Sequence, residues 1–281
     1  MENQIRIDAL LPSEMAQRAE TIGAAKAVMN AATMFALAVL AGAFISLGAL
    51  FATTISAGAS GVVPFGLVKL LMGLVFCLGL ILVVVGGAEL FTGNNLIVMA
   101  WASGKVSTRA LLRNWAIVYA GNFAGSIGTA VLVLLSKQYT FGGGAVGKTA
   151  LSIATAKVQY GFVQAIALGI LCNGLVCLAV WLTYSARSTT DKILAIIFPI
   201  TAFVAAGFEH SVANMYFIPM GLFIKKFDAT WAAASGVDLS SLTWEHFLVN
   251  NLLPVTIGNI IGGTVLVALI YWFVYLRDHR A

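Results

Sequence analysis

Two glutamates and one histidine are the residues of this chain best suited to chemistry, because each lies inside a long apolar stretch. Glu89 and Glu209 occupy two such stretches, and His210 directly follows the second glutamate. An ionisable group at mid-membrane costs about 3 kcal/mol, so both carboxylates need partners or water. Imidazole changes its charge between about pH 5 and 8. These residue types indicate a polar path through a membrane.

The same short pattern surrounds both glutamates. Small residues precede each one, and an asparagine follows five positions later, as Asn94 and Asn214. We expect both carboxylates to accept hydrogen bonds from frayed backbone N–H groups and so to hold a helix break open. A lone buried histidine more often satisfies local backbone, but the position beside a break favours a functional His210.

The composition excludes an ordinary soluble domain. Hydrophobic residues make up 60% of the 281 and charged residues 10%, whereas soluble domains carry about 25% charged residues. Six apolar stretches are long enough to cross a bilayer. They are Ala31–Ile55, Pro64–Ser103, Thr108–Leu135, Val158–Tyr184, Lys192–Ile224 and Phe247–Leu276. The second and fifth are too long for a single pass.

The two halves of the chain resemble each other. Asn, Val, Gly, Asn and Gly recur at identical spacing in Asn114–Gly125 and Asn251–Gly262, and a polar insertion over 227–246 lengthens the second half. Three spans in each half, 31–136 and 157–276, reverse the direction of the second half. The sequence therefore predicts an inverted 3+3 repeat with its pathway at the repeat interface.

The two long spans are predicted to be interrupted near the glutamates. Their helical pieces would be Pro64–Val85, Asn95–Ser103, Lys192–Val204 and Ser211–Ile224. Non-helical backbone at this depth must be buried in protein or face a wet cavity. Asn122 and Asn259 could therefore either line the lumen or tie the interrupted backbone.

Basic residues predict the orientation of the chain. Six spans put both termini on one side, and that side carries ten lysines and arginines against six on the other. The positive-inside rule then places both termini in the cytoplasm. Within residues 1–30, Leu11, Met15, Ala19 and Ile22 form an apolar stripe that predicts an amphipathic interfacial helix. Residues 277–281 form a short cytoplasmic tail.

At these motifs the sequence resembles the formate/nitrite transporter family, and most closely its formate-channel branch. The motifs are Gly87-Ala-Glu-Leu-Phe-Thr92, Gly207-Phe-Glu-His-Ser-Val-Ala-Asn-Met215 and Pro254-Val-Thr-Ile-Gly-Asn-Ile-Ile-Gly-Gly263. The resemblance implies an aquaporin-like, all-α membrane fold in a bacterial inner membrane. It also implies a homopentamer with one pore per protomer, passage of formate and related small monovalent anions, and pH-dependent gating that involves the N-terminal helix.

The resemblance also implies a set of pore residues. Leu80, Leu90 and Phe203 would form apolar constrictions with Phe76 and Phe91 nearby. Thr92 and His210 would meet at the centre, Lys157 and Asn173 would lie toward the mouth of the second half, and Asn259 near the lumen. Apolar rings slow ions, so His210 would compensate the anion's charge. It would donate hydrogen bonds when neutral, and pair with the anion or transfer a proton to it when charged.

The sequence leaves some alternative functions open and disfavours others. A nitrite channel of the same family and a proton-coupled formate transporter would use the same residues. An aquaporin-type channel is disfavoured because no Asn-Pro-Ala triplet occurs. Three histidines without a cysteine–histidine cluster leave little for a metal or redox enzyme, so we expect no metal or cofactor. We expect lipid and a small anion as partners, and no nucleic acid.

Overall fold

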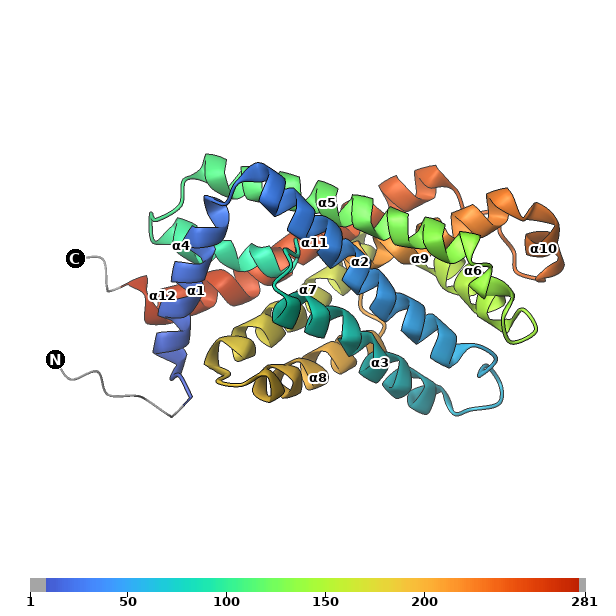
Figure 1. The fold of residues 1–281 in the computed structure, drawn as a ribbon, viewed down its shortest axis with the longest axis horizontal. Coiled ribbons are helices and arrows are strands. Elements are labelled where there is room, and N and C mark those ends of the chain that lie inside the picture. The colour runs from blue at the N-terminus through green and yellow to red at the C-terminus, as the bar shows by residue number, and fades with distance from the viewer. Residues whose placement is uncertain (1–8, 278–281) are drawn as a thin grey trace.

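The computed structural model describes residues 9–277, in which helices are joined by turns and loops and no strand occurs. Figure 1 shows the arrangement. The α-helices are α1 (Pro12–Ala27), α2 (Ala31–Ser56), α3 (Phe65–Gly86), α4 (Val98–Ala102), α5 (Thr108–Leu135), α6 (Ala145–Lys157), α7 (Phe162–Ser185), α8 (Thr189–Ala205), α9 (Ser211–Phe227), α10 (Ala229–Ala234), α11 (Leu253–Gly263) and α12 (Ile270–Tyr275). Two 3-10 helices, η1 (Gly93–Ile97) and η2 (Gln138–Thr140), lie between them. Two π-helices belong to the last long helix, His246–Tyr275. The first, η3 (His246–Leu252), precedes α11, and the second, η4 (Thr264–Leu269), joins α11 to α12.

Five helices among the described residues are long and apolar enough to cross a membrane. They are α2, α3, α5, α7 and the continuous helix His246–Tyr275. Helices α1, α4 and α12 gather at one end of the elongated molecule, and α6 and α10 at the other (Figure 1). We name these the α1 end and the α6 end.

Small residues bring the long helices into backbone contact. A Cβ atom added at Gly125 of α5 would lie 2.0 Å from the carbonyl oxygen of Val39 in α2. A Cβ atom at Gly258 of α11 would lie 2.2 Å from the carbonyl oxygen of Ile166 in α7. Close approach of this kind replaces the missing hydrophobic driving force between helices in lipid. The pairs α2–α5 and α7–α11 therefore form the rigid walls that carry the site.

Two long stretches are interrupted. The first breaks between α3 and η1 and resumes as η1 and α4, and the second breaks between α8 and α9. Both interruptions lie within the segments that the sequence predicts for them, Gly86–Asn94 and Ala205–His210. Each half of the second stretch is only 17 residues long.

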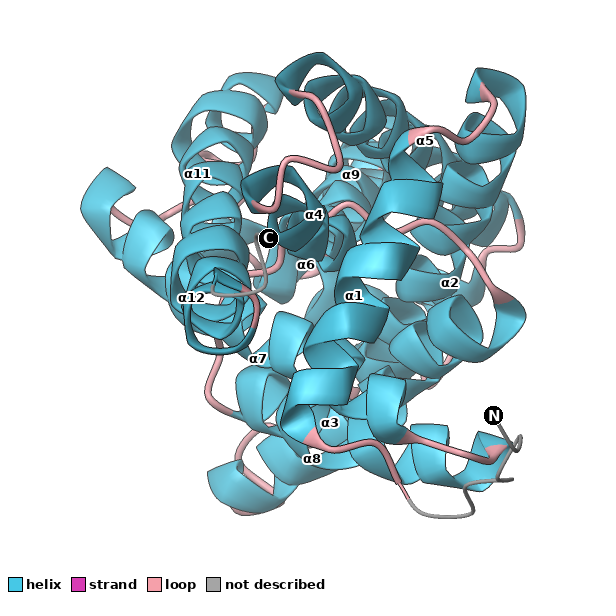
Figure 2. Cartoon of the chain, turned by 90° about the vertical axis from the view of Figure 1, so that its left-hand side faces the viewer, coloured by secondary structure: helices cyan, strands magenta, loops and turns pink. Residues whose placement is uncertain are grey.

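Helix α1 packs on the body of the protein, and Figure 2 looks onto this end, where α1 crosses close to α4 and α12. Met15 and Ala19 are buried, whereas Leu11 of the expected stripe is 59% exposed. The buried face of α1 therefore meets protein. The remaining parts of the predicted N-terminal segment and tail, residues 1–8 and 278–281, lie outside the described residues.

Candidate functional site

Both helix breaks begin at a glycine in the left-handed conformation. Gly87 follows α3 with φ +77°, and Gly207 follows the end of α8 with φ +75°. A side chain at either position would be strained, which is why glycine is the usual residue at such helix ends. The glycines turn the chain out of the helix, and the two glutamates follow within the non-helical segments.

Glu89 accepts hydrogen bonds from side chains of two elements, α1 and η1. Its Oε1 lies 2.7 Å from Nζ of Lys26, at the end of α1, and its Oε2 lies 2.7 Å from Nδ2 of Asn94. Asn94 also donates to Oδ1 of Asn114 at 3.0 Å, and the Asn114 amide donates to the carbonyl of Lys26 at 3.2 Å. We call these four residues the first cluster.

The second half repeats this arrangement with equivalent residues. Glu209 lies 2.6 Å from Nζ of Lys157 at the end of α6 and 2.7 Å from Nδ2 of Asn214. Asn214 donates to Asn251 at 2.8 Å, and Asn251 donates to the carbonyl of Lys157 at 2.7 Å. We call these the second cluster. A buried ion pair is tolerated when further hydrogen bonds satisfy its oxygens, as they do here.

The sequence predicted that backbone N–H groups donate to the two carboxylates, but the donors in the structure are side chains. The backbone of the first break is instead held by Asn122 of α5. Its Oδ1 accepts the N–H of Phe91 at 2.9 Å, and its Nδ2 donates to the carbonyls of Ala38 and Glu89 at 2.8 and 2.9 Å. One amide can do this because it both accepts and donates, whereas a carboxylate can only accept.

Asn259 of α11 holds the second break in the same way. Its Oδ1 accepts the N–H of Ser211 at 2.9 Å, and its Nδ2 donates to the carbonyls of Gly169 and Glu209, both at 2.9 Å. Asn259 is fully buried. Asn122 and Asn259 could line the lumen or tie the interrupted backbone, and the geometry favours the second role. Their hydrogen bonds give partners to backbone groups that the breaks would otherwise leave unpaired.

Thr92 and His210, from opposite breaks, meet at the centre. Thr92 Oγ1 lies 2.9 Å from His210 Nε2, and both residues are buried. His210 is the N-cap of α9, and its Nδ1 accepts the backbone N–H of Ala213 at 3.1 Å. Because Nδ1 accepts, a neutral ring carries its proton on Nε2, which donates to the threonine oxygen. Among the described residues, the hydroxyl hydrogen of Thr92 has no acceptor of its own.

Two cavities approach this centre from opposite ends. The α1 vestibule has a volume of about 220 Å³ and is lined by α1 and the first break, including Lys26, Leu80 and Leu90. The α6 vestibule has a volume of about 150 Å³ and is lined by α6 and the second break, including Lys157 and His210. The two vestibules share no lining residue. The path between them is therefore closed in this structure.

Apolar side chains separate the vestibules. Leu80, Leu90, Phe76 and Phe203 are each at most 3% exposed. Phe76 and Phe203 line the α6 vestibule and pack edge to face with ring centroids 5.6 Å apart, and the ring of Phe203 stacks 5.9 Å from that of His210. An anion crossing between the vestibules must pass these side chains.

Four residues from the expected pore set line neither vestibule, namely Thr92 and Asn259, whose contacts are given above, and Phe91 and Asn173. Phe91 packs edge to face on Trp115 and Tyr119, in a separate apolar hollow. Asn173 is fully buried, and its Nδ2 lies 2.8 Å from Oδ1 of Asn95 and 2.7 Å from the carbonyl of Asn259.

The carbonyl of Thr92 is also held from α7. Asn173 Nδ2 and Cys177 Sγ each lie 3.3 Å from it. Asn173 therefore contacts the backbone that carries the central threonine, and not a cavity.

Sequence reasoning missed four members of this site. Lys26, Asn95, Asn114 and Asn251 received no role. The two asparagines at 114 and 251 open the repeated motif, so their equivalence was visible. Lys26 lies 63 positions before Glu89, so no local pattern joins the two residues. The one signal for this pair is the matching pair Lys157–Glu209 of the second half, whose members are 52 positions apart.

The described residues match a known family over most of the chain. The family model described as formate/nitrite transporter matches residues 13–273. The chain belongs to the formate/nitrite transporter family. The resemblance inferred from the sequence motifs is thereby confirmed.

Individual relatives and solved structures agree with this assignment. The formate channel FocA of Escherichia coli (strain K12) is 47% identical over 276 residues, covering 97% of this chain and 96% of the relative. The formate channel FocA of Haemophilus influenzae is 43% identical over 262 residues, 92% of each chain. A solved pentameric formate channel with formate bound superposes with a TM-score of 0.82 at 47% identity, covering 88% of this chain and 98% of that one. An FNT family ion channel superposes with a TM-score of 0.78 at 29% identity, covering 93% and 99%. These relatives are channels.

Proposed function

We propose that this protein is a channel for formate and related small monovalent anions. The observation that carries the proposal is the Thr92–His210 hydrogen bond, 2.9 Å long, at the point where two vestibules approach each other. It offers one hydroxyl hydrogen to an anion in an otherwise apolar constriction. The relatives named as formate channels, at up to 47% identity, support formate as the substrate.

The proposed path runs through the apolar constriction. An anion in either vestibule meets Leu80 and Leu90 on one side or Phe76 and Phe203 on the other, and these side chains must move to admit it. Between them the Thr92 hydroxyl donates to the anion while His210 Nε2–H donates to Thr92. Donors fixed in a water-poor site stabilise negative charge more strongly than water-exposed donors.

In this proposal the two lysine–glutamate pairs and the buried asparagines around them position the breaks. These residues are Lys26–Glu89, Lys157–Glu209, Asn94, Asn214, Asn122, Asn259 and Asn173. Apart from Oδ1 of Asn214, which has no hydrogen-bond partner among the described residues, their polar atoms bond to one another or to backbone and so hold Thr92 and His210 in place. Lys157 lines the α6 vestibule as well, together with its partner Glu209.

We propose that flux depends on pH through His210. Protonation at Nδ1 would break the hydrogen bond that Nδ1 accepts from the N–H of Ala213, and with it the side-chain cap of α9. The charged ring would then pair with the anion or transfer a proton to it, and the second case makes the protein a proton-coupled transporter. Voltage-clamped flux distinguishes the two, because only a channel carries current down an anion gradient without protons.

The proposed architecture is an inverted 3+3 repeat, assembled as a pentamer in the bacterial inner membrane with both termini in the cytoplasm. Its six passes are α2, the α3–α4 stretch, α5, α7, the α8–α9 stretch and the helix His246–Tyr275. The matching clusters and matching asparagine contacts of the two halves support the repeat. The superposition on a pentameric formate channel supports the assembly.

The function is tested by uptake into liposomes that contain the purified protein. Formate, nitrite, acetate and hydrosulfide are compared at two pH values for the parent, His210→Asn and His210→Phe. The proposal expects formate to enter fastest and its pH profile to change in both variants. A higher rate for nitrite would favour the nitrite channel. An unchanged pH profile would remove the role of His210.

A further inference from the structure

The vestibule at the α1 end is electrically balanced. Lys26 and Glu89 are the only charged side chains that line it among the described residues, and they pair with each other at 2.7 Å. An anion that approaches this vestibule meets no excess positive charge from its lining.

A second hollow extends the cavity at the α6 end. It has a volume of about 790 Å³ and lies between the turn 56–63, the start of α3 and one face of α6. We call it the α6 antechamber. It shares Lys69, Met72 and Ile153 with the α6 vestibule. The two hollows therefore adjoin each other, and the antechamber lies next to the cavity that His210 lines.

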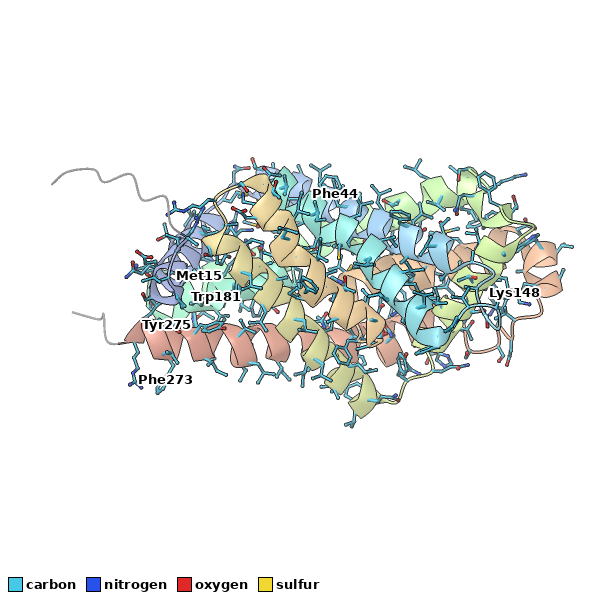
Figure 3. All side chains as sticks on the ribbon, turned by 90° about the horizontal axis from the view of Figure 1, so that it is seen from below. Met15, Phe44, Lys148, Trp181, Phe273 and Tyr275 are labelled. Atoms are coloured by element: carbon cyan, nitrogen blue, oxygen red, sulfur yellow. The ribbon has the colours of Figure 1, made fainter. Side chains whose placement is uncertain are left out.

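Two lysines of the antechamber lack an acidic partner. Among the described residues, neither Lys69 nor Lys148 lies within ion-pairing distance of a carboxylate, whereas Lys157 pairs with Glu209. Lys69 is half-buried, and its Nζ lies 5.4 Å from the ring centre of Phe65. Lys148 is exposed and lies at the α6 end, opposite Met15 and Trp181 (Figure 3).

The lining of the α6 end therefore carries an excess of two positive charges. Lys69, Lys148 and Lys157 face one glutamate there. The excess has no counterpart in the other half. Counted 120 positions on, as from Glu89 to Glu209, Lys69 corresponds to Thr189. Counted 131 positions back, as from Lys157 to Lys26, Lys148 corresponds to Gln17. Lys69 stands where the antechamber joins the vestibule, between the exposed Lys148 and the paired Lys157.

We propose that Lys69 and Lys148 form a capture site for small monovalent anions, which collects them from solution at the α6 end alone. The inference rests on the proposed anion channel and adds a direction to it. A concave wall with one sign of charge raises the local concentration of the opposite ion. Anions are therefore gathered at low concentration from the α6 end, while the balanced α1 vestibule gives no such advantage.

The test is formate flux through Lys69→Gln/Lys148→Gln in phosphatidylcholine vesicles with known insertion orientation. These vesicles hold no anionic lipid, so only the free anion can occupy the site. At low formate the initial rate from the α6 end is expected to fall roughly 10-fold. The rate at saturating formate and the rate from the α1 end stay near those of the parent. The loss should shrink at high ionic strength, because salt screens exposed charges.

Lys226→Gln is the matched control. Lys226 is an exposed lysine at the same end of the molecule that lines neither the vestibule nor the antechamber. An unchanged low-formate rate in the double variant, or an equal loss in Lys226→Gln, would overturn the capture site. A parent protein without flux would instead contradict the proposed function.

Discussion

The two halves of the molecule hold their breaks with the same side chains but put different side chains at the centre. Each break has a lysine–glutamate pair, two asparagines bridging that pair, and one further asparagine on the broken backbone. The agreement extends to the helices that supply the lysines, since α1 and α6 each end next to their glutamate. The framework is therefore shared by both halves.

The central residues depart from this agreement. Glu89 and Glu209 are 120 positions apart, and at this spacing His210 corresponds to Leu90, while Thr92 corresponds to Val212. The polar pair thus has apolar residues at both equivalent positions. The comparison indicates that the two halves build their breaks alike, and in the proposed channel the anion chemistry comes from the residues that differ between them.

The largest expected effect follows from breaking the second cluster. Lys157→Met leaves the Glu209 carboxylate, only 1% exposed, without its cation. An uncompensated buried charge of this kind destabilises a protein by about 3–5 kcal/mol. Thermal unfolding of the purified protein in detergent measures the loss. The double variant Lys157→Met/Glu209→Met should recover part of it, and additive losses would contradict the pairing.

A smaller loss is expected from the same change in the first cluster. The side chain of Lys26 is 27% exposed, against 15% for Lys157, so water can partly replace it at Glu89. We expect Lys26→Met to cost about 1–3 kcal/mol in the same unfolding assay. A loss as large as that of Lys157→Met would show that exposure does not distinguish the two clusters.

The Asn173 contacts exist in one half only, because the position equivalent to Asn173 is Gly42. Asn173→Ala leaves Oδ1 of Asn95 and the carbonyl of Asn259 without this donor, at a cost of about 2 kcal/mol. The carbonyl of Thr92 loses a contact as well, so formate flux in liposomes should fall. Parent-like stability together with parent-like flux would contradict a positioning role.

The smallest effect is expected at Cys177. Its thiol donates to the carbonyl of Thr92 at 3.3 Å, but a thiol is a weak donor and the residue otherwise behaves as a small apolar side chain. Cys177→Ala should change unfolding free energy by about 1 kcal/mol or less. A loss equal to that of Asn173→Ala would mean that the thiol, and not the amide, holds this carbonyl.

The sequence predicted the features that are visible within short segments. A glycine followed by a carboxylate inside an apolar stretch indicated where each helix breaks, and the structure interrupts the helices at those segments. The contact between Thr92 and His210 joins residues 118 positions apart. It was expected from the family resemblance, since no local pattern could bring these residues together.

The lysine partners of the carboxylates could not be predicted from the sequence. Lys26 was counted only as a basic residue near the membrane boundary, and Lys157 was expected to face the pore. Each reaches its glutamate because a separate helix ends beside the break, and the position of that helix depends on packing throughout the fold. The expectation that backbone N–H groups satisfy the carboxylates was wrong for the same reason.

The central claim is tested most directly by formate flux through Thr92→Val, which removes one hydroxyl and matches the equivalent Val212. Thr155→Val is the control, because the hydroxyl of Thr155 is buried and has no hydrogen-bond partner within residues 9–277. We expect flux through Thr92→Val to fall by about 100-fold, as when a charge-stabilising donor is removed, while flux through Thr155→Val stays near that of the parent. Parent-like flux through Thr92→Val would contradict the account.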